Sequence, residues 1–162
     1  MSIASVSERQ VQPGLRLTPY VDATRVMRFA GSPAKEELIT HLAQRMASSS
    51  LITDIAGFTA AVLERERATT TGVGNGLALP HAQLASVGDF VVALAVVAEG
   101  CDFASLDGQP VQVVALIAAP TTDRPRYLRL LSAVAAQLNR PEVRARMLAA
   151  PDDAHLVAAF LS

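Results

Sequence analysis

Two valine-rich apolar runs in the middle of the chain constrain its fold more than any other feature of the sequence. The runs cover residues 90–97 and 111–118, and the turn signal Asp107-Gly108 lies between them. Apolar runs of this length, bounded by turn residues, are typical of strands buried on both faces. Both are far shorter than the roughly 20 apolar residues that a membrane-spanning helix requires. We therefore expect two central strands and no insertion into a membrane.

Segments with helical periodicity lie on both sides of these runs. Pro33 suits the first turn of one helix, and Thr53 or Asp54 can cap a second helix that runs to about Arg67. Between this helix and the apolar runs, residues 69–79 read as a strand, a tight glycine turn and a second strand. Further helices are expected over about 125–138, from Pro141, and after a cap at Asp152 or Asp153.

The order of these elements predicts an α/β fold. Helices before and after a set of strands indicate a single domain with a mixed β-sheet sandwiched between helices on both faces. A chain of 162 residues fits one such domain. We expect residues 1–17 to form a loosely held N-terminal extension and residues 18–162 to form the domain.

Composition excludes several classes of function. The net charge of −1 gives no basic footprint, so nucleic acid is not an expected partner. The first residues lack the apolar core of a signal peptide, so we expect the protein in the cytoplasm. Cys101 is the only cysteine and is expected to be a small buried hydrophobe.

The glycine run Gly72-Val73-Gly74-Asn75-Gly76 resembles a nucleotide-binding loop only superficially. Its spacing is wrong for a dinucleotide fingerprint, no helix start follows it, and the Lys-Ser/Thr of a P-loop is absent. The run is better interpreted as a tight turn, and no cofactor is expected.

Three histidines are candidates for chemistry. His41 and His155 lie off the apolar stripes of their helices and are expected to be solvated surface residues. No histidine pair has the spacing of a metal motif, so no metal site is expected. His81 differs, because it follows the strand Leu77-Ala78-Leu79 and the ladder-breaking Pro80.

We expect His81 to emerge just past the end of that strand, on chain that has left the sheet. Sites in open α/β sheets lie outside the carboxyl ends of strands. A near-neutral imidazole is nucleophilic, as a phosphoryl acceptor must be. From the residues alone, a functional histidine and an ordinary end-of-strand histidine remain equally open.

Arg65 and Arg67 close the second helix and also allow two interpretations. Both can complement the helix dipole. One of them can instead bind a phosphoryl group on His81, because guanidinium binds phosphate through two hydrogen bonds. Their spacing in the sequence does not decide between the two.

The string Glu64-Arg65-Glu66, followed by Thr70-Thr71-Gly72-Val73-Gly74-Asn75-Gly76-Leu77-Ala78-Leu79-Pro80-His81, resembles a long family signature. It is similar to that of the enzyme IIA domains of the fructose/mannitol/nitrogen-regulatory class in the bacterial sugar phosphotransferase system. Segments on both sides also resemble this family, from roughly Leu17 to the end of the chain.

This resemblance implies a mechanism. The small carrier HPr, or its nitrogen-branch counterpart, would donate a phosphoryl group to His81. The group would pass to a cysteine of a IIB domain or remain as a regulatory mark read by a transporter or kinase. By the same resemblance, Arg65 would balance the phosphoryl charge, and Thr71 with nearby backbone N–H groups would complete the phosphate-binding cradle.

The Gly-Val-Gly-Asn-Gly string and the absence of IIB or IIC segments favour the nitrogen-regulatory branch. A sugar-specific IIA component of the fructose or mannitol type stays open. So does a binding module that keeps the fold without the chemistry.

One position departs from the family pattern. The family usually carries a second histidine in a His-Leu-x-x-Leu context, and here the matching residue is Tyr127. A phenol donates a neutral hydrogen bond but cannot become a cation. Losing the charge-assisted bond, worth about 1–2 kcal/mol, would slow transfer on the order of tenfold. Tyr127 also shares a helical stripe with Leu131, Val134 and Leu138, so it can line the site, pack in the core, or do both.

Overall fold

A computed structural model describes residues 15–162 of the chain. The expected N-terminal extension, residues 1–17, therefore lies almost wholly outside the described residues. Leu15 and Leu17, the described apolar residues at its end, are partly buried against the core. The strands are β1 Val26–Phe29, β2 Gly72–Gly74, β3 Leu77–Ala78, β4 His81–Gln83, β5 Val91–Cys101 and β6 Val111–Ala119.

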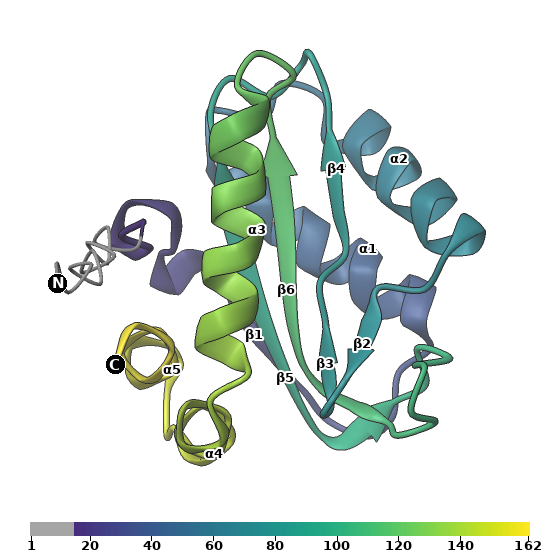
Figure 1. Ribbon diagram of the computed structural model, residues 1–162, viewed down its shortest axis with the longest axis vertical. Helices are drawn as coiled ribbons and strands as arrows, with labels where there is room; N and C mark the ends of the chain where they lie inside the picture. The colour runs from purple at the N-terminus through teal and green to yellow at the C-terminus, as the bar shows by residue number, and fades with distance from the viewer. Residues whose placement is uncertain (1–14) are drawn as a thin grey trace, which may run out of the picture.

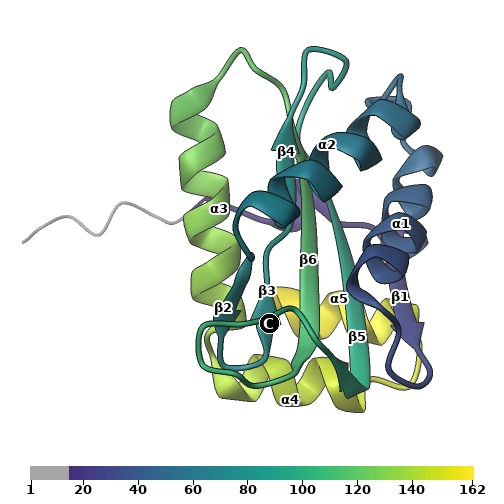
Figure 2. The same cartoon turned by 90° about the vertical axis from the view of Figure 1, so that its right-hand side faces the viewer.

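The two apolar runs form the centre of the sheet, which confirms the prediction of two central strands. β5 and β6 are antiparallel neighbours, with Val92 opposite Ile117. The sheet order is β1-β5-β6-β3-β2, and β4 also pairs with β6. β1 runs parallel to β5, and both β3 and β4 run parallel to β6, so the sheet is mixed as predicted (Figures 1 and 2).

Helices cover both faces of this sheet, which confirms the predicted α/β architecture (Figures 1 and 2). Side chains of β5 alternate between two apolar clusters. Leu94 packs with the helices that follow the sheet, whereas Ala93 and Ala95 pack with the helices that precede β2. The helices are α1 Lys35–Arg45, α2 Ile55–Ala68, α3 Arg124–Leu138, α4 Pro141–Ala149 and α5 Asp153–Leu161.

Side-chain caps start α2, α3 and α5 close to where the sequence predicts them. α1 has no side-chain cap and begins at Lys35, so Pro33 precedes the helix and does not lie in its first turn as expected. Asp54 accepts a hydrogen bond from the Gly57 backbone N–H, and Asp152 accepts one from the His155 backbone N–H. Each bond satisfies a donor that the first turn of a helix leaves unpaired. In the same way Asp123 caps α3, the helix that faces the site described below.

The predicted strand over residues 69–73 is shorter than expected. Thr69 is the C-cap of α2, so β2 begins only at Gly72. The turn that follows has positive φ at Gly74, Asn75 and Gly76, with values of 95°, 57° and 74°. Glycine and asparagine tolerate this left-handed region better than other residues, which explains the composition of the run.

The expectation that the chain leaves the sheet before His81 is wrong. Leu77 pairs with Val113, and His81 pairs with Ile117 in the same register, so pairing with β6 resumes after Pro80. Pro80 lacks an N–H, but its carbonyl accepts a hydrogen bond from the Ile117 N–H at 3.0 Å. The proline therefore interrupts the strand without ending it, and His81 lies within the sheet as the first residue of β4.

Candidate functional site

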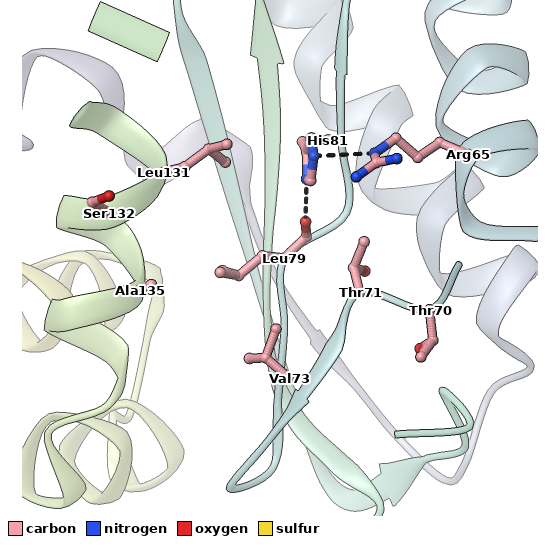
Figure 3. Close-up of a pocket in the computed structure, with 9 residues that line it drawn as sticks. All are labelled: Arg65, Thr70, Thr71, Val73, Leu79, His81, Leu131, Ser132 and Ala135. Carbon is pink, nitrogen blue, oxygen red and sulfur yellow. Dashed lines mark hydrogen bonds between the residues drawn. The ribbon is translucent and has the colours of Figure 1, made fainter. Parts of the chain in front are cut away.

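The imidazole of His81 is held by hydrogen bonds at both ring nitrogens (Figure 3). Nδ1 lies 2.7 Å from the carbonyl oxygen of Leu79, and a carbonyl can only accept, so Nδ1 carries the proton. Nε2 is therefore unprotonated in the neutral ring, and it accepts a hydrogen bond from the Nε–H of Arg65 at 3.2 Å. This arrangement selects one tautomer and points the basic Nε2 lone pair toward a guanidinium group.

The surroundings of His81 favour its neutral form. Partial burial lowers the pKa of His81 below its ordinary value, and the positive charge of Arg65 lowers that pKa further. The Leu79 carbonyl and the Glu66 carboxyl act in the opposite direction without reversing the shift. Because the nucleophilic form of imidazole is the neutral one, His81 is available as a nucleophile at neutral pH.

His81 opens into a pocket of about 360 Å³ between the end of α2, the glycine hairpin and α3. Arg65 reaches in from α2, and Leu131, Ser132 and Ala135 face it from α3 across the opening (Figure 3). The pocket lining is mainly apolar around a few polar groups. The other lining residues are Thr70, Thr71, Val73 and Leu79.

Arg65 and Arg67 have different environments. Arg65 lies in the last turn of α2 and directs its guanidinium at His81. Arg67 is exposed and does not line the pocket. Sequence spacing left both arginines as candidates, and the structure brings one of them to the histidine.

Thr71 lines the pocket, but its hydroxyl is already engaged. The hydroxyl donates to a carboxyl oxygen of Glu66 at 2.6 Å, and the Thr71 backbone N–H donates to the other at 2.9 Å. A hydroxyl has one proton to donate, so Thr71 presents only acceptor lone pairs to the pocket in this arrangement. A role for Thr71 in phosphate binding stays a prediction, and it requires this hydroxyl to rotate away from Glu66.

Glu66 is the residue near this site that sequence reasoning did not single out. Its side chain is 2% exposed, and it receives both Thr71 bonds and an ion pair from Lys35 at 3.4 Å. Charged residues are almost never buried to this extent without such partners. A glutamate between two arginines at a helix end gave no signal of burial in the sequence.

Tyr127 both packs in the core and faces His81. The residue is 7% exposed and belongs to the apolar cluster beneath α3. The ring centroid lies 6.0 Å from that of His81 at an interplanar angle of 59°. Burial raises the pKa of the Tyr127 phenol, so the group is a neutral hydrogen-bond donor at neutral pH.

The remaining candidates lie away from the pocket. His41 and His155 are exposed, as predicted. Cys101 is buried, and its pKa is raised to about 11, mainly by burial, so it behaves as the expected hydrophobe. Within residues 15–162, no cluster of three or more His, Cys, Asp or Glu side chains could hold a metal ion. No helix in that part of the chain has both the length and the apolar character to span a bilayer.

Comparisons with known proteins show what the chain is similar to. Residues 21–162 match the family model described as "Phosphoenolpyruvate-dependent sugar phosphotransferase system, EIIA 2". A fructose-specific EIIABC component of Bacillus subtilis is 33% identical over 139 residues, which is 86% of this chain and 22% of that protein. The chain therefore spans about a fifth of that relative.

Two shorter relatives are covered more fully. A fructose-specific EIIA component of Haloferax volcanii is 35% identical over 116 residues, or 72% of this chain and 75% of the relative. A nitrogen regulatory protein of Bradyrhizobium diazoefficiens is 32% identical over 129 residues, or 80% of this chain and 83% of the relative. Relatives with sugar-specific names and with nitrogen-regulatory names thus resemble the chain to similar degrees.

Solved structures share the fold. The nitrogen regulatory protein IIA-Ntr from Neisseria meningitidis superposes with a TM-score of 0.75 at 22% identity, covering 86% of this chain and 94% of that chain. The IIA domain in a complex of enzyme IIA mannitol with phosphorylated enzyme IIB mannitol from Escherichia coli gives a TM-score of 0.71 at 19% identity, covering 86% and 96%.

Proposed function

The chain belongs to the EIIA 2 family of the phosphoenolpyruvate-dependent sugar phosphotransferase system, and we propose that it carries a phosphoryl group on Nε2 of His81. One observation carries the proposal. The Nε2 lone pair is unprotonated, lies at a pocket that opens to solvent, and faces the guanidinium of Arg65 at 3.2 Å. A phosphoryl acceptor needs these three conditions together: an unprotonated lone pair, access for a partner, and a positive charge for the incoming oxygens.

The chemistry needs little beyond this geometry. Nε2 attacks the phosphorus of a phosphohistidine on the donor protein, the donor's N–P bond breaks, and the donor's imidazole leaves with that electron pair. Positive charge develops on the His81 ring during attack, and the Nδ1–H bond to the Leu79 carbonyl stabilises it. The transition state of such a transfer is loose, so positioning and charge neutralisation account for most of the catalysis.

Arg65 has two roles in this proposal. In the resting form its Nε–H occupies the Nε2 lone pair. As the phosphoryl group arrives, the guanidinium transfers its hydrogen bonds to the phosphoryl oxygens, which it can bind through two parallel bonds.

Tyr127 lies beside the His81 ring and adds a neutral donor at most, so we propose slower transfer than a second histidine would support.

The donor in this proposal is an HPr-type phosphocarrier, and the exchange takes place in the cytoplasm. The receiver is a IIB cysteine, by analogy with the mannitol enzyme IIA that forms a complex with phosphorylated enzyme IIB, or a transporter or kinase that reads the phosphorylation state. We favour the nitrogen-regulatory branch because of the Gly-Val-Gly-Asn-Gly string, while the similarity to fructose-specific relatives supports the sugar-specific alternative.

The test is phosphorylation by a purified, phosphorylated HPr-type carrier. Wild-type protein should gain the mass of one acid-labile phosphoryl group, and His81→Ala should gain none. His155→Ala is the matched control, because His155 is exposed and lies on α5 away from the pocket, and this variant should behave as wild type. Failure of the wild type to accept phosphate, or equal labelling of His81→Ala, would refute the carrier proposal.

Two further measurements separate the branches. Onward transfer from phosphorylated protein to a IIB cysteine would favour the sugar-specific role. Partner binding that changes tenfold or more on phosphorylation would favour a regulatory role, whereas binding that ignores both the donor and His81→Ala would indicate a binding module without the chemistry.

A further inference from the structure

A closed circuit of hydrogen bonds connects Arg65 to His81 and returns to the residue next to Arg65. The Arg65 Nε–H donates to His81 Nε2, and His81 Nδ1–H donates to the Leu79 carbonyl. The Leu79 N–H donates to the Thr71 carbonyl at 3.1 Å. The Thr71 N–H and hydroxyl both donate to the carboxyl group of Glu66, the residue after Arg65 in α2.

Glu66 is the member that closes this circuit. Its two bonds to Thr71 span the connection between the end of α2 and the start of β2, so they fix the last turn of the helix against the hairpin. That turn carries Arg65, and the hairpin leads through Leu79 to His81. The separation between the guanidinium and Nε2 therefore depends on how Glu66 holds Thr71.

The burial of Glu66 makes this link a stiff one. The carboxyl group has almost no contact with solvent. Besides Thr71 it contacts Lys35, whose Nζ lies 3.4 Å from the carboxyl oxygen Oε1 and supplies the compensating positive charge. The Lys35 ammonium also lies 5.5 Å from the centroid of the Phe103 ring, so the cation has little freedom of its own. Fully satisfied buried polar networks of this kind hold a unique geometry.

We propose that Glu66 is a positioning residue for phosphoryl transfer, which acts by holding Arg65 at the correct distance from Nε2 of His81. The inference rests on the proposed carrier function of His81. Glu66 touches neither the imidazole nor the incoming phosphoryl group, and its effect passes through Arg65. Glu66 contributes through the length of its side chain and its hydrogen bonds to Thr71, because Lys35 neutralises its charge.

Substitutions of Glu66 separate the effect of its side-chain length and hydrogen bonds from the effect of its charge. Glu66→Gln keeps an oxygen for the Thr71 N–H and offers an amide N–H to the Thr71 hydroxyl oxygen, so transfer should stay within about threefold of wild type. Glu66→Ala removes both bonds. Misplacement of a catalytic group by about 1 Å costs up to about a hundredfold, so Glu66→Ala should slow transfer by at least about tenfold.

Two controls guard against a merely structural explanation. Glu64→Ala removes an exposed carboxylate two residues away on the same helix and should leave the transfer rate unchanged. If Glu66→Ala does not fold, Glu66→Asp retains the charge but withdraws the carboxyl group by one methylene, and it should show the same loss of transfer. Thermal unfolding of each variant identifies those that are folded.

The decisive experiment is a double-mutant cycle with Arg65→Met, combined with nitrogen NMR of unphosphorylated His81. Residues that act through one contact are not additive, so Glu66→Ala should add less than about twofold to the loss already caused by Arg65→Met. In the spectra, Glu66→Ala and Arg65→Met should move the Nε2 resonance of His81 in the same direction, while Glu66→Gln should leave the Nε2–Arg65 bond in place.

Fully additive losses, or an unchanged Nε2 resonance in folded Glu66→Ala, would overturn the positioning role. Loss of transfer in Glu66→Gln as large as in Glu66→Ala would also overturn it, because the charge and not the reach would then matter. The NMR measurement uses protein without phosphate, so it can fail while the carrier proposal stands, and it can succeed if His81 is never phosphorylated.

Discussion

Replacing Arg65 by methionine is expected to slow phosphoryl transfer to His81. The methionine keeps much of the apolar stem at the end of α2 and removes the group that donates to Nε2 at 3.2 Å. It also removes a positive charge that lowers the pKa of His81. The imidazole therefore becomes more basic in this variant, and the incoming phosphoryl group has no cationic partner.

The size of the effect follows from the bonds that are lost. A hydrogen bond to a charged group contributes about 1.5–3 kcal/mol, and about 1.4 kcal/mol corresponds to a factor of ten in rate. Loss of that contribution predicts a decrease of between about tenfold and about a hundred and fifty-fold. Because Arg65 is an exposed residue, solvent screening places the expected value toward the lower end, about tenfold to thirtyfold.

The assay is a rapid-quench measurement of the rate at which phosphate passes from a phosphorylated HPr-type carrier to the protein. Arg65→Lys is the matched variant, because it keeps the charge and loses the planar fork that binds two phosphoryl oxygens. It should recover part of the rate and remain slower than wild type. Arg67→Met, at an exposed position outside the pocket, should change the rate by less than about twofold.

A rate for Arg65→Met within twofold of wild type would refute this reasoning. So would an equal loss in Arg67→Met, because the effect would then come from the general charge of the helix end. Equal rates for Arg65→Lys and wild type would show that a point charge suffices and that the guanidinium geometry is irrelevant.

Three further predictions concern the same site and the core that supports it. Tyr127→Phe should slow transfer by about twofold to tenfold, because it removes the neutral donor that the phenol would offer to the phosphoryl group, and a faster variant would contradict this. Tyr127→His should speed transfer by up to about tenfold, and an unchanged rate would contradict that expectation. Because burial lowers the pKa of His81, the transfer rate should be constant from pH 8 to neutrality and should fall only under acidic conditions. A rate that already falls as the pH is lowered from 8 to 7 would contradict this. Phe58→Ala, at a fully buried position of α2, should lower the free energy of unfolding by about 3–5 kcal/mol in urea titrations, and a loss below 1 kcal/mol would show that the site can collapse.

Local patterns predicted most of the fold. The two central strands followed from apolar runs bounded by turns, and the helices followed from caps such as Asp54 and Asp152, because both signals lie within a few residues of the element they define. β1 was not predicted. Its four residues, Val26–Phe29, form a strand only through parallel pairing with Leu94–Val97, far away in the chain.

The site was less predictable than the fold. Pro80 indicated the end of a strand, but the constant register against β6 lets pairing continue past it, and this depends on a partner strand about 36 residues away. The contact between Arg65 and His81 joins the last turn of α2 to the start of β4, and it depends on how these two elements pack. The burial of Glu66 depended on the Thr71 backbone, whose position is set by β2. None of these relations is encoded in the spacing of residue types.

The pairing of His81 with Ile117 has a consequence for how a partner could tell the two chemical forms apart. The backbone beneath the imidazole is paired with β6, a central strand of the sheet, so addition of a phosphoryl group leaves that backbone little freedom to move. What changes is the local electrostatic potential, because a doubly charged phosphoryl group occupies the apolar-lined pocket beside a single guanidinium. A protein that distinguishes the forms must therefore sense the sign of the field at this opening, and we expect salt to weaken its discrimination more than its overall affinity.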